Sequence, residues 1–181
     1  MKIVAAIGAL AIALAFTDAQ ACGNERWAVK TLTDPAAREV HFKPRPDSIA
    51  RLVTLRPPAQ LGARTKAEKV TVSMRVRLIA TKLEPDGDIH LIVGEPRNLA
   101  TTMIVEFPDL GCTRGAQHRW AMELAKRRLL AAEGPVGDTY RSLSGTATVS
   151  GVIFFDFLHG QRGVAPNGIE LHPVLRFRPG P

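Results

Sequence analysis

The stretch FFDFLHGQRGVAPNGIELHPVL, residues 154–175, decides how the chain is expected to fold. Two apolar runs flank a loop that contains three glycines, one proline and one asparagine. This pattern predicts two strands joined by a connection of a sheet or barrel. Four of its polar residues lie within 17 positions of each other, namely Asp156, His159, Glu170 and His172. The stretch therefore predicts a candidate site as well as a turn of the chain.

Upstream of this stretch, apolar and polar residues alternate from Val70 onward, which predicts a long half-buried strand. The alternation slips at Leu78 and Ile79, and this predicts a bulge or sharp bend of the kind that a small barrel needs. A turn at residues 84–87, EPDG, ends the strand. The further strands that we expect are Asp88–Val93, Thr101–Phe107, Gly145–Phe157 and Ile169–Phe177.

One convincing helix is expected between the third and fourth strands, over Arg114–Ala132. Thr113 is its predicted N-cap, and Gly134 and Pro135 are expected to stop it. Three strands, a helix and two strands are the topology of the OB-fold, a five-stranded Greek-key barrel. We therefore expect a mainly β, OB-like five-stranded barrel over residues 69–181. The alternative is an α+β sheet covered by one helix.

Residues 22–68 are expected to form an irregular N-terminal arm. Trp27 and Val29 are its expected anchors, and Asp47 could cap a short helix over residues 48–55. Residues 56–69 have prolines near their start, are basic and contain few apolar side chains. This composition is typical of a linker or exposed loop.

Residues 1–21 have the pattern of a secretory signal peptide. A positive start at Lys2 precedes a 14-residue apolar run, and Ala19 and Ala21 supply the small residues of a cleavage site. The run is shorter than the roughly 20 residues that a spanning helix needs. The sequence therefore predicts an exported protein, periplasmic or secreted after cleavage near Ala21, without a transmembrane span in the mature chain.

The net charge of +7 survives this cleavage, because Lys2 and Asp18 are removed together. A basic exported protein is attracted to anionic partners such as phospholipid head groups, acidic polysaccharide or nucleic acid. An anionic ligand or a component of the cell envelope is therefore an expected partner. The charge indicates no finer specificity, and the oligomeric state is left open.

The two cysteines, Cys22 and Cys112, would lie in a compartment that permits disulfides. If they pair, the chain-entropy model gives the bond a value of roughly 4–5 kcal/mol. Free thiols are one alternative. Acylation of Cys22 as a lipoprotein cysteine is another, although the preceding residues fit a lipoprotein signal poorly.

Strand alternation is expected to gather polar side chains on the outer face of the barrel. Asp88 and His90 would point outward together, Glu106 would lie opposite one of them, and Glu170 and His172 would point outward from the last strand. The OB-fold binds ligands on the face of its second and third strands, aided by the loop before its last strand. That loop carries His159, Arg162 and Asn167.

Several functions fit this polar face. The first hypothesis is a binding module, with a divalent metal held by His90, His159 and Asp88 as a candidate set that Glu106 or Asp156 could join. The second is a small hydrolase for phosphodiesters or cell-wall material, using metal-bound water or metal-free acid–base catalysis. Each residue alone more often anchors its own loop through hydrogen bonds. The sequence names no catalytic residue.

Binding of nucleic acid is a weaker hypothesis. Single-strand binding uses aromatic residues on the barrel face together with basic side chains. The outward positions of the second and third strands hold no aromatic residue, and the aromatic run Phe154, Phe155 and Phe157 is expected in the core. Arg75 and Arg77 could still contact phosphate.

Four segments together resemble a family of uncharacterised exported bacterial proteins. They are TDP at 33–35, KLEPDGDIHLIV at 82–93, TMIVEFP at 102–108 with Cys112, and GVIFFDFLHGQRGVAPNGIELHPVL at 151–175. The last block is the most specific of them. The resemblance implies an envelope or secreted location and a shared polar constellation, and it implies no reaction or cofactor.

Overall fold

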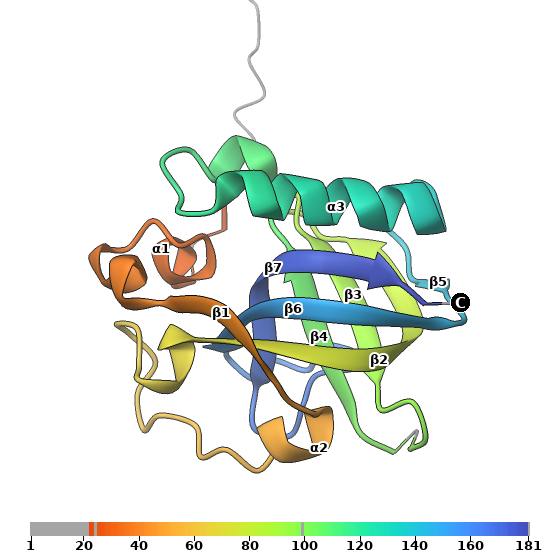
Figure 1. Ribbon diagram of the computed structural model, residues 1–181, viewed down its shortest axis with the longest axis horizontal. Helices are drawn as coiled ribbons and strands as arrows, with labels where there is room; N and C mark the ends of the chain where they lie inside the picture. The colour runs from red at the N-terminus through yellow and green to blue at the C-terminus, as the bar shows by residue number, and fades with distance from the viewer. Residues whose placement is uncertain (1–21, 24, 99, 181) are drawn as a thin grey trace, which may run out of the picture.

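The computed structural model describes residues 22–23, 25–98 and 100–180, so the expected signal peptide over residues 1–21 lies outside the described residues. Five long strands close into a barrel (Figure 1). They are β2 (Val70–Leu83), β3 (Ile89–Gly94), β4 (Thr102–Phe107), β6 (Thr146–Phe155) and β7 (Ile169–Pro179).

The barrel strands follow the order β2-β3-β4-β7-β6, and pairing of β6 with β2 closes the ring. β4 and β7 are parallel, and the other barrel pairs are antiparallel. The helix α3 (Arg119–Glu133) lies between the third and fourth barrel strands in the chain. The prediction of a mainly β, OB-like five-stranded barrel is therefore confirmed, and closure excludes the alternative of an open sheet.

The predicted bulge is present in β2. Leu78 pairs with Val93 and Ala80 pairs with Ile92, so Ile79 is an extra residue. The bulge lies where β2 changes partner, because the strand pairs with β6 up to Arg77 and with β3 from Arg77 onward. A bulge bends its strand and increases the local twist, and this bend lets one strand serve both sides of a small barrel. The short strand β5 (Arg141–Ser142) pairs with β2 beyond the bulge.

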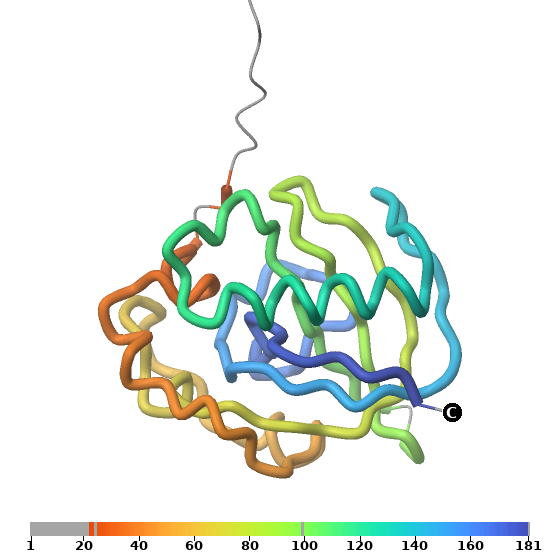
Figure 2. The backbone as a smooth tube through the Cα atoms, turned by 45° about the horizontal axis from the view of Figure 1, so that its top comes forward, coloured from red at the N-terminus to blue at the C-terminus, as the bar shows by residue number. Residues whose placement is uncertain are grey.

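The barrel is filled by alternate side chains of its strands, including Phe107 and Phe177. The helix α3 packs alongside β7 (Figure 2). It buries Ala121, Met122, Ala125 and Leu129. Trp120, on the same helix, is 68% exposed.

The helix begins five residues later than predicted. Its N-cap is His118, not Thr113, because Thr113 donates its hydroxyl to the carbonyl of Leu110 in the turn η3 (Leu110–Cys112). The helix ends at Glu133, immediately before Gly134, which adopts a φ of +78°. The predicted stop signal of the helix is therefore confirmed, and only its predicted first residue was wrong.

The N-terminal segment is more ordered than an irregular arm. It contains α1 (Trp27–Lys30), η1 (Pro35–Glu39), β1 (His41–Pro46), α2 (Ile49–Leu52) and η2 (Ala67–Lys69). In Figures 1 and 2 this segment, red to orange, runs along the outside of the yellow β2. β1 pairs with β2 in parallel as an edge strand, a position that tolerates Pro44 and Pro46 because one side needs no donors.

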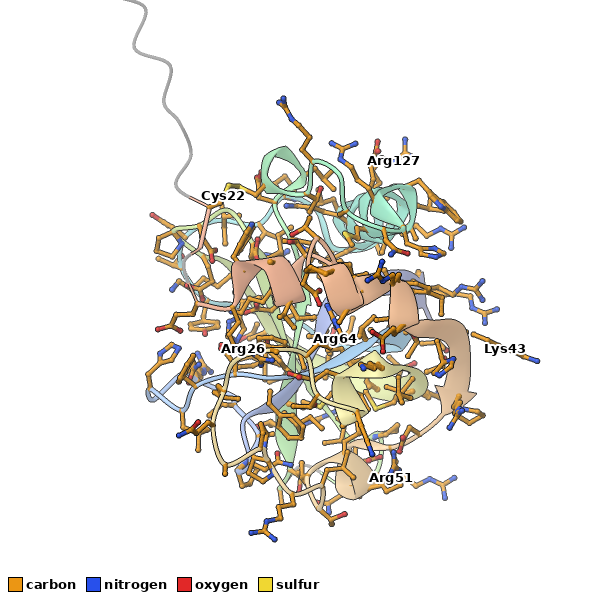
Figure 3. The ribbon with its side chains drawn as sticks, turned by 90° about the vertical axis from the view of Figure 1, so that its left-hand side faces the viewer. Cys22, Arg26, Lys43, Arg51, Arg64 and Arg127 are labelled. Carbon is orange, nitrogen blue, oxygen red and sulfur yellow. A yellow bond between two sulfur atoms is a disulfide. The ribbon has the colours of Figure 1, made fainter. Side chains whose placement is uncertain are left out.

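Two expectations for this segment were wrong. Ser48, not Asp47, caps α2 by accepting the backbone N–H of Arg51, while the Asp47 carboxylate binds the Arg51 guanidinium. Residues 56–69 are not only an exposed linker, because Arg64 and Glu68 are buried. Figure 3 shows Arg26 and Arg64 inside this side of the molecule, whereas Lys43 extends into solvent.

The expected disulfide is present. Cys22 and Cys112 are bonded, with 5.7 Å between their Cα atoms, across a sequence separation of 90 residues. Both sulfur atoms are therefore engaged in this bond, which ties Cys22, ahead of α1, to η3.

Within the described ranges, no helix combines the length and the apolar character that crossing a bilayer would require.

Candidate functional site

Strand register brings the predicted polar residues together. His90 on β3 pairs with Glu106 on β4, and Glu170 on β7 pairs with Ile104 on β4. The alternate residues Ile89, Leu91 and Val105 belong to the core. The expectation that the polar residues share the outer face, with Glu106 opposite His90, is therefore confirmed.

This outer face is not the open surface that strand alternation suggests. Asp88, His90, Glu106, Glu170 and His172 are all 7% exposed or less. The N-terminal segment and the loop between β6 and β7 cover these residues. The alternation of residues along a strand cannot predict this cover, because it comes from other parts of the chain.

The loop between β6 and β7 packs closely on the sheet. Ile92 and Ile104, which alternation places on the same outer face as His90 and Glu106, are also buried. A Cβ atom on Gly163 would approach Ile92 Cγ2 to 2.5 Å, so the loop backbone lies directly on β3. The usual ligand face of an OB-like barrel is therefore largely covered by this loop.

His172 lies at the centre of a buried charged cluster. Its Nε2 is 3.2 Å from Asp88 Oδ2, and its Nδ1 is 3.1 Å from Glu106 Oε2 and 3.5 Å from Glu170 Oε1. Beside it, His90 Nδ1 lies 3.4 Å from an oxygen of Glu106 and 3.4 Å from an oxygen of Glu84.

These contacts lie within ion-pair distance, but they do not have the geometry of hydrogen bonds. Several buried polar atoms of the cluster therefore have no hydrogen-bond partner among the described residues: Asp88 Oδ2, Asp156 Oδ1, Glu170 Oε1 and both ring nitrogens of His172. Buried polar groups in native proteins are nearly always paired, so a concentration of unpaired ones needs a reason such as a bound ion or water.

The cluster moves the pKa values of its members apart. Burial by itself would lower the pKa of His172, but the carboxylates of Asp88, Glu106 and Glu170 outweigh it and raise that pKa well above its usual range. Burial would raise the pKa of Glu106, yet His172 lowers it to about 2. Burial and the Glu106 charge raise the pKa of Glu170 to about 8. Burial lowers the pKa of His90, which favours its neutral form.

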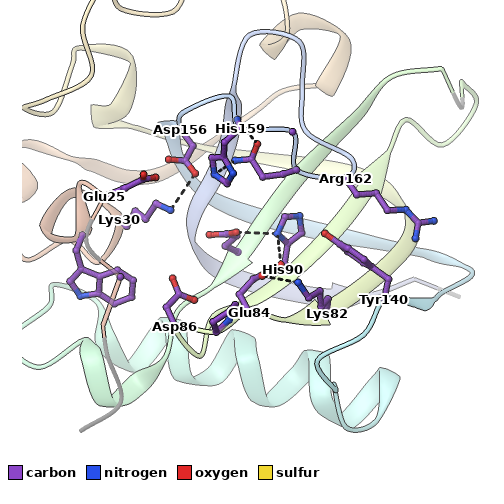
Figure 4. A pocket seen from close by; sticks show the side chains of 16 residues that line it. Glu25, Lys30, Lys82, Glu84, Asp86, His90, Tyr140, Asp156, His159 and Arg162 are labelled. Carbon is purple, nitrogen blue, oxygen red and sulfur yellow. Dashed lines mark hydrogen bonds and ion pairs between the residues drawn. The ribbon is translucent and has the colours of Figure 1, made fainter.

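A pocket of about 740 Å³ opens above this cluster (Figure 4). His90 and Glu106 line it from the sheet, and Lys30 contributes an ammonium group 3.3 Å from Asp156 Oδ2. Its walls come from the N-terminal segment, the β2–β3 hairpin, the residues before β5 and the β6–β7 loop. These wall residues include Glu25, Trp27, Lys82, Glu84, Asp86, Tyr140, His159, Gln161 and Arg162.

The predicted metal set of His90, His159 and Asp88 is not brought together. His159 lies on the exposed loop, where its Nε2 is 2.6 Å from the side-chain nitrogen of Gln161. His90 instead lies on the sheet beside Glu84 and Glu106. Among the described residues, two other groups have ligand atoms within 4.8 Å of one another: Asp88, Glu106 and His172, and Glu25, Asp156 and His159.

The other loop residues have different roles. Arg162 lines the pocket and lies 5.1 Å from the centre of the Tyr140 ring. Asn167 donates to the carbonyls of Leu52 and Leu55 and so holds α2. The aromatic run is buried at Phe154 and Phe155, but Phe157 is 41% exposed, contrary to expectation.

Sequence reasoning missed the pocket residues of the N-terminal segment, above all Lys30. The Lys30 side chain is buried against Asp156 and lies 5.5 Å from the centre of the Phe154 ring. A single lysine at the end of a four-residue helix carries no sequence signal for this role. Only the docking of α1 on the barrel creates it.

No protein-family model, curated protein or solved structure matches the chain.

Proposed function

We propose that the protein is an exported binding module with an OB-fold barrel, and that its ligand is a small, positively charged molecule held in the pocket. The observation that carries the proposal is the charge of the pocket lining. Carboxylates outnumber lysine and arginine there by five to three, although the whole chain has a net charge of +7. A locally acidic cleft concentrates cations near it.

Two of these carboxylates are available to a ligand. Lys30 is paired with Asp156 and Lys82 with Glu84, whereas Glu25 and Asp86 have no ion-pair partner within the described part of the chain. Burial and neighbouring Asp88 raise the pKa of Asp86, as expected where negative charges crowd together. A cationic ligand would relieve this repulsion.

Aromatic side chains support the same ligand class. Trp27 and Tyr140 both line the pocket. The Tyr140 ring already lies 5.5 Å from Lys82 Nζ and 5.1 Å from the Arg162 guanidinium, so its face accepts cations. A volume near 740 Å³ is within the usual range for small-molecule sites.

The expected anionic partners fit this pocket poorly and stay predictions for the rest of the basic surface. Nucleic-acid binding is weakened further, because Ile92 and Ile104 are buried and leave no open strand face on which bases could stack. The resemblance of residues 151–175 to exported bacterial proteins and the disulfide both support export.

Calorimetry on the mature, chelator-treated chain tests the proposal, with spermidine and arginine as probes and glutarate as the anionic control. We expect saturable binding of the cations only, and weaker binding as salt rises. Glu25→Gln with Asp86→Asn should weaken it several-fold, because partly exposed charge pairs each contribute about 0–1 kcal/mol. Glu133→Gln, outside the pocket, is the matched control. Equal binding of glutarate, or no binding of either cation, would refute the proposal.

A small hydrolase is a second candidate, favoured by the pairing of His90 with Glu106 in the pocket. A neutral imidazole beside a carboxylate can act as a general base. Hydrolysis of bis-p-nitrophenyl phosphate by the wild type, with a loss of about 10²–10⁴-fold in His90→Gln, would support this candidate. Absence of turnover, or equal turnover by the two proteins, would count against it for this substrate class.

A further inference from the structure

We infer that Asp88, Glu106 and His172 form a binding site for a divalent transition-metal ion beneath the floor of the pocket. This inference deepens the proposed function and rests on its pocket, because the ion would enter by the same acidic opening. Glu106 is the member of the group that lines the pocket.

The ligand types and their spacing suit such an ion. Each of the three residues offers one ligand atom, and these atoms lie within 4.8 Å of one another. One imidazole with two carboxylates is a donor set for zinc, manganese or iron. Asp88 lies immediately before β3, Glu106 on β4 and His172 on β7, so the barrel itself holds the three residues in place.

Unpaired atoms provide an independent reason for an ion. Asp88 is 1% exposed and His172 is 0% exposed, yet Asp88 Oδ2 and both His172 nitrogens lack hydrogen-bond partners among the described residues. These are the atoms that would coordinate an ion or hold the ligands around it. In metal sites, a carboxylate commonly contacts the second nitrogen of a ligating histidine, and His172 has a carboxylate near each of its nitrogens.

The charge of the buried cluster also favours a bound cation. Asp88, Glu106, Glu170 and Asp156 are four buried carboxyl groups, and the basic side chains within ion-pair distance of them among the described residues are Lys30, His90 and His172. An unbalanced buried charge is unfavourable. A divalent ion among these carboxyl groups would offset their negative charge.

The second candidate group, Glu25, Asp156 and His159, is less suitable. Asp156 Oδ2 is already bound by Lys30, and the Gln161 side-chain nitrogen is 2.6 Å from His159 Nε2. That Gln161 amide is held in place, because it also contacts the Phe157 carbonyl and the His159 backbone N–H. Glu25 and His159 are exposed, whereas all three residues of the inferred site are buried.

The experiment titrates the mature chain, after chelator treatment, with Zn²⁺, Mn²⁺ and Co²⁺. We expect one ion per chain by calorimetry and a visible absorption band for bound Co²⁺. Glu106→Gln keeps the size of the side chain and should weaken binding by at least about 10-fold, the lower end of what is lost when a group that only supports a ligand is removed. His159→Gln should bind these ions as the wild type does.

Several results would contradict the inferred metal site. No saturable binding of any of the three ions would overturn the inference, as would unchanged affinity in folded Glu106→Gln. Loss of binding in His159→Gln alone would place the ion at the exposed group instead. If Glu106→Gln does not fold, the His172 ring signals of the wild type in NMR decide: they must shift on adding Zn²⁺, and unshifted signals would refute the site.

Failure of this inference is distinguishable from failure of the proposed function. Spermidine binding is measured on chelator-treated protein and needs no metal. Binding of spermidine without binding of any metal ion would refute the metal site alone.

Discussion

Arg26 and Glu68 form a bidentate ion pair between the residue before α1 and the turn η2 that precedes β2. Arg26 Nη1 donates to Glu68 Oε1 at 2.7 Å and Nη2 donates to Oε2 at 2.9 Å, with the two side chains 5% and 0% exposed. Glu68 also accepts the backbone N–H groups of Thr65 and Phe155. One carboxylate therefore connects the segment before β1, the turn before β2 and the end of β6.

Glu68→Gln is expected to destabilise the protein strongly, because it leaves the buried Arg26 guanidinium without its counter-charge. Breaking a buried ion pair from one side typically costs about 3–5 kcal/mol. Urea unfolding of the mature chain measures this loss as a lower midpoint. The double variant Arg26→Met with Glu68→Gln should lose less than the sum of the two single variants.

The pair between Lys69 and Glu39 is the matched control. Its atoms are also 2.7 Å apart, but the Glu39 side chain is 54% exposed. Lys69→Met is therefore expected to lower stability far less than Glu68→Gln does. Equal losses for Glu68→Gln and Lys69→Met would contradict the importance of burial here.

The same pair predicts a specific response to acid. Burial would raise the pKa of Glu68, but Arg26 and the N–H groups of Thr65 and Phe155 lower it below the ordinary value of 4.5. A lowered pKa in the folded state stabilises the protein above the unfolded value, and this contribution is lost as the pH falls toward the folded value. The advantage of the wild type over Glu68→Gln should therefore be constant above pH 4.5 and shrink below it. Unfolding free energies measured across this range test the trend, and a constant difference would contradict it.

Reduction of the disulfide is expected to loosen the rim of the pocket. Gly23, Glu25 and Trp27 line the pocket close to Cys22, and Trp27 donates its indole N–H to the carbonyl of Cys112. Loss of a native disulfide typically costs about 2–5 kcal/mol. In a Trp120→Phe background Trp27 is the only remaining tryptophan of two, so its fluorescence reports on this rim.

We expect Trp27 emission to shift to longer wavelength on reduction and to return on reoxidation. The matched control is Cys22→Ser with Cys112→Ser, whose emission should not respond to reductant. An unchanged spectrum in reduced wild-type protein with a lower unfolding midpoint would show that the disulfide stabilises the fold without holding the rim.

Gly163→Ala is expected to detach part of the β6–β7 loop from the sheet. Gly163 has a φ of +84°, and a Cβ atom there would approach Ile92 to 2.5 Å. Gly160 is the matched control. Its φ of +85° is nearly equal to that of Gly163, but a Cβ atom at Gly160 would have no neighbour within 4 Å. Both substitutions incur about 1–2 kcal/mol of backbone strain, and only Gly163→Ala adds a clash of about 1–3 kcal/mol.

Hydrogen exchange measures the local effect of these two substitutions. Gly163→Ala should increase exchange at the β3 and loop amides more than Gly160→Ala does. Equal exchange in the two variants would show that the loop does not depend on its contact with Ile92.

Local patterns in the sequence were sufficient to predict the barrel. Strict alternation from Val70 specified one face of β2, and the slip at Leu78 and Ile79 specified its bulge. Gly134 ended α3 as expected, because the chain there needs a positive φ. Where local signals conflicted, prediction failed: the start of α3 moved to Arg119 once Thr113 was engaged in a separate turn.

For the candidate site, too, the sequence predicted one part of the arrangement and the tertiary structure decided the other. Alternation within each strand determined that His90, Glu106, Glu170 and His172 share one face, because side chains two residues apart point to the same side of a sheet. Only the tertiary structure decided that this face is buried, because Lys30 and the Gly163 loop reach it from distant parts of the chain. Residue spacing along a strand has no information about what covers the strand. The sequence by itself therefore determined the barrel and its polar face, and long-range packing turned that face into the floor of a pocket.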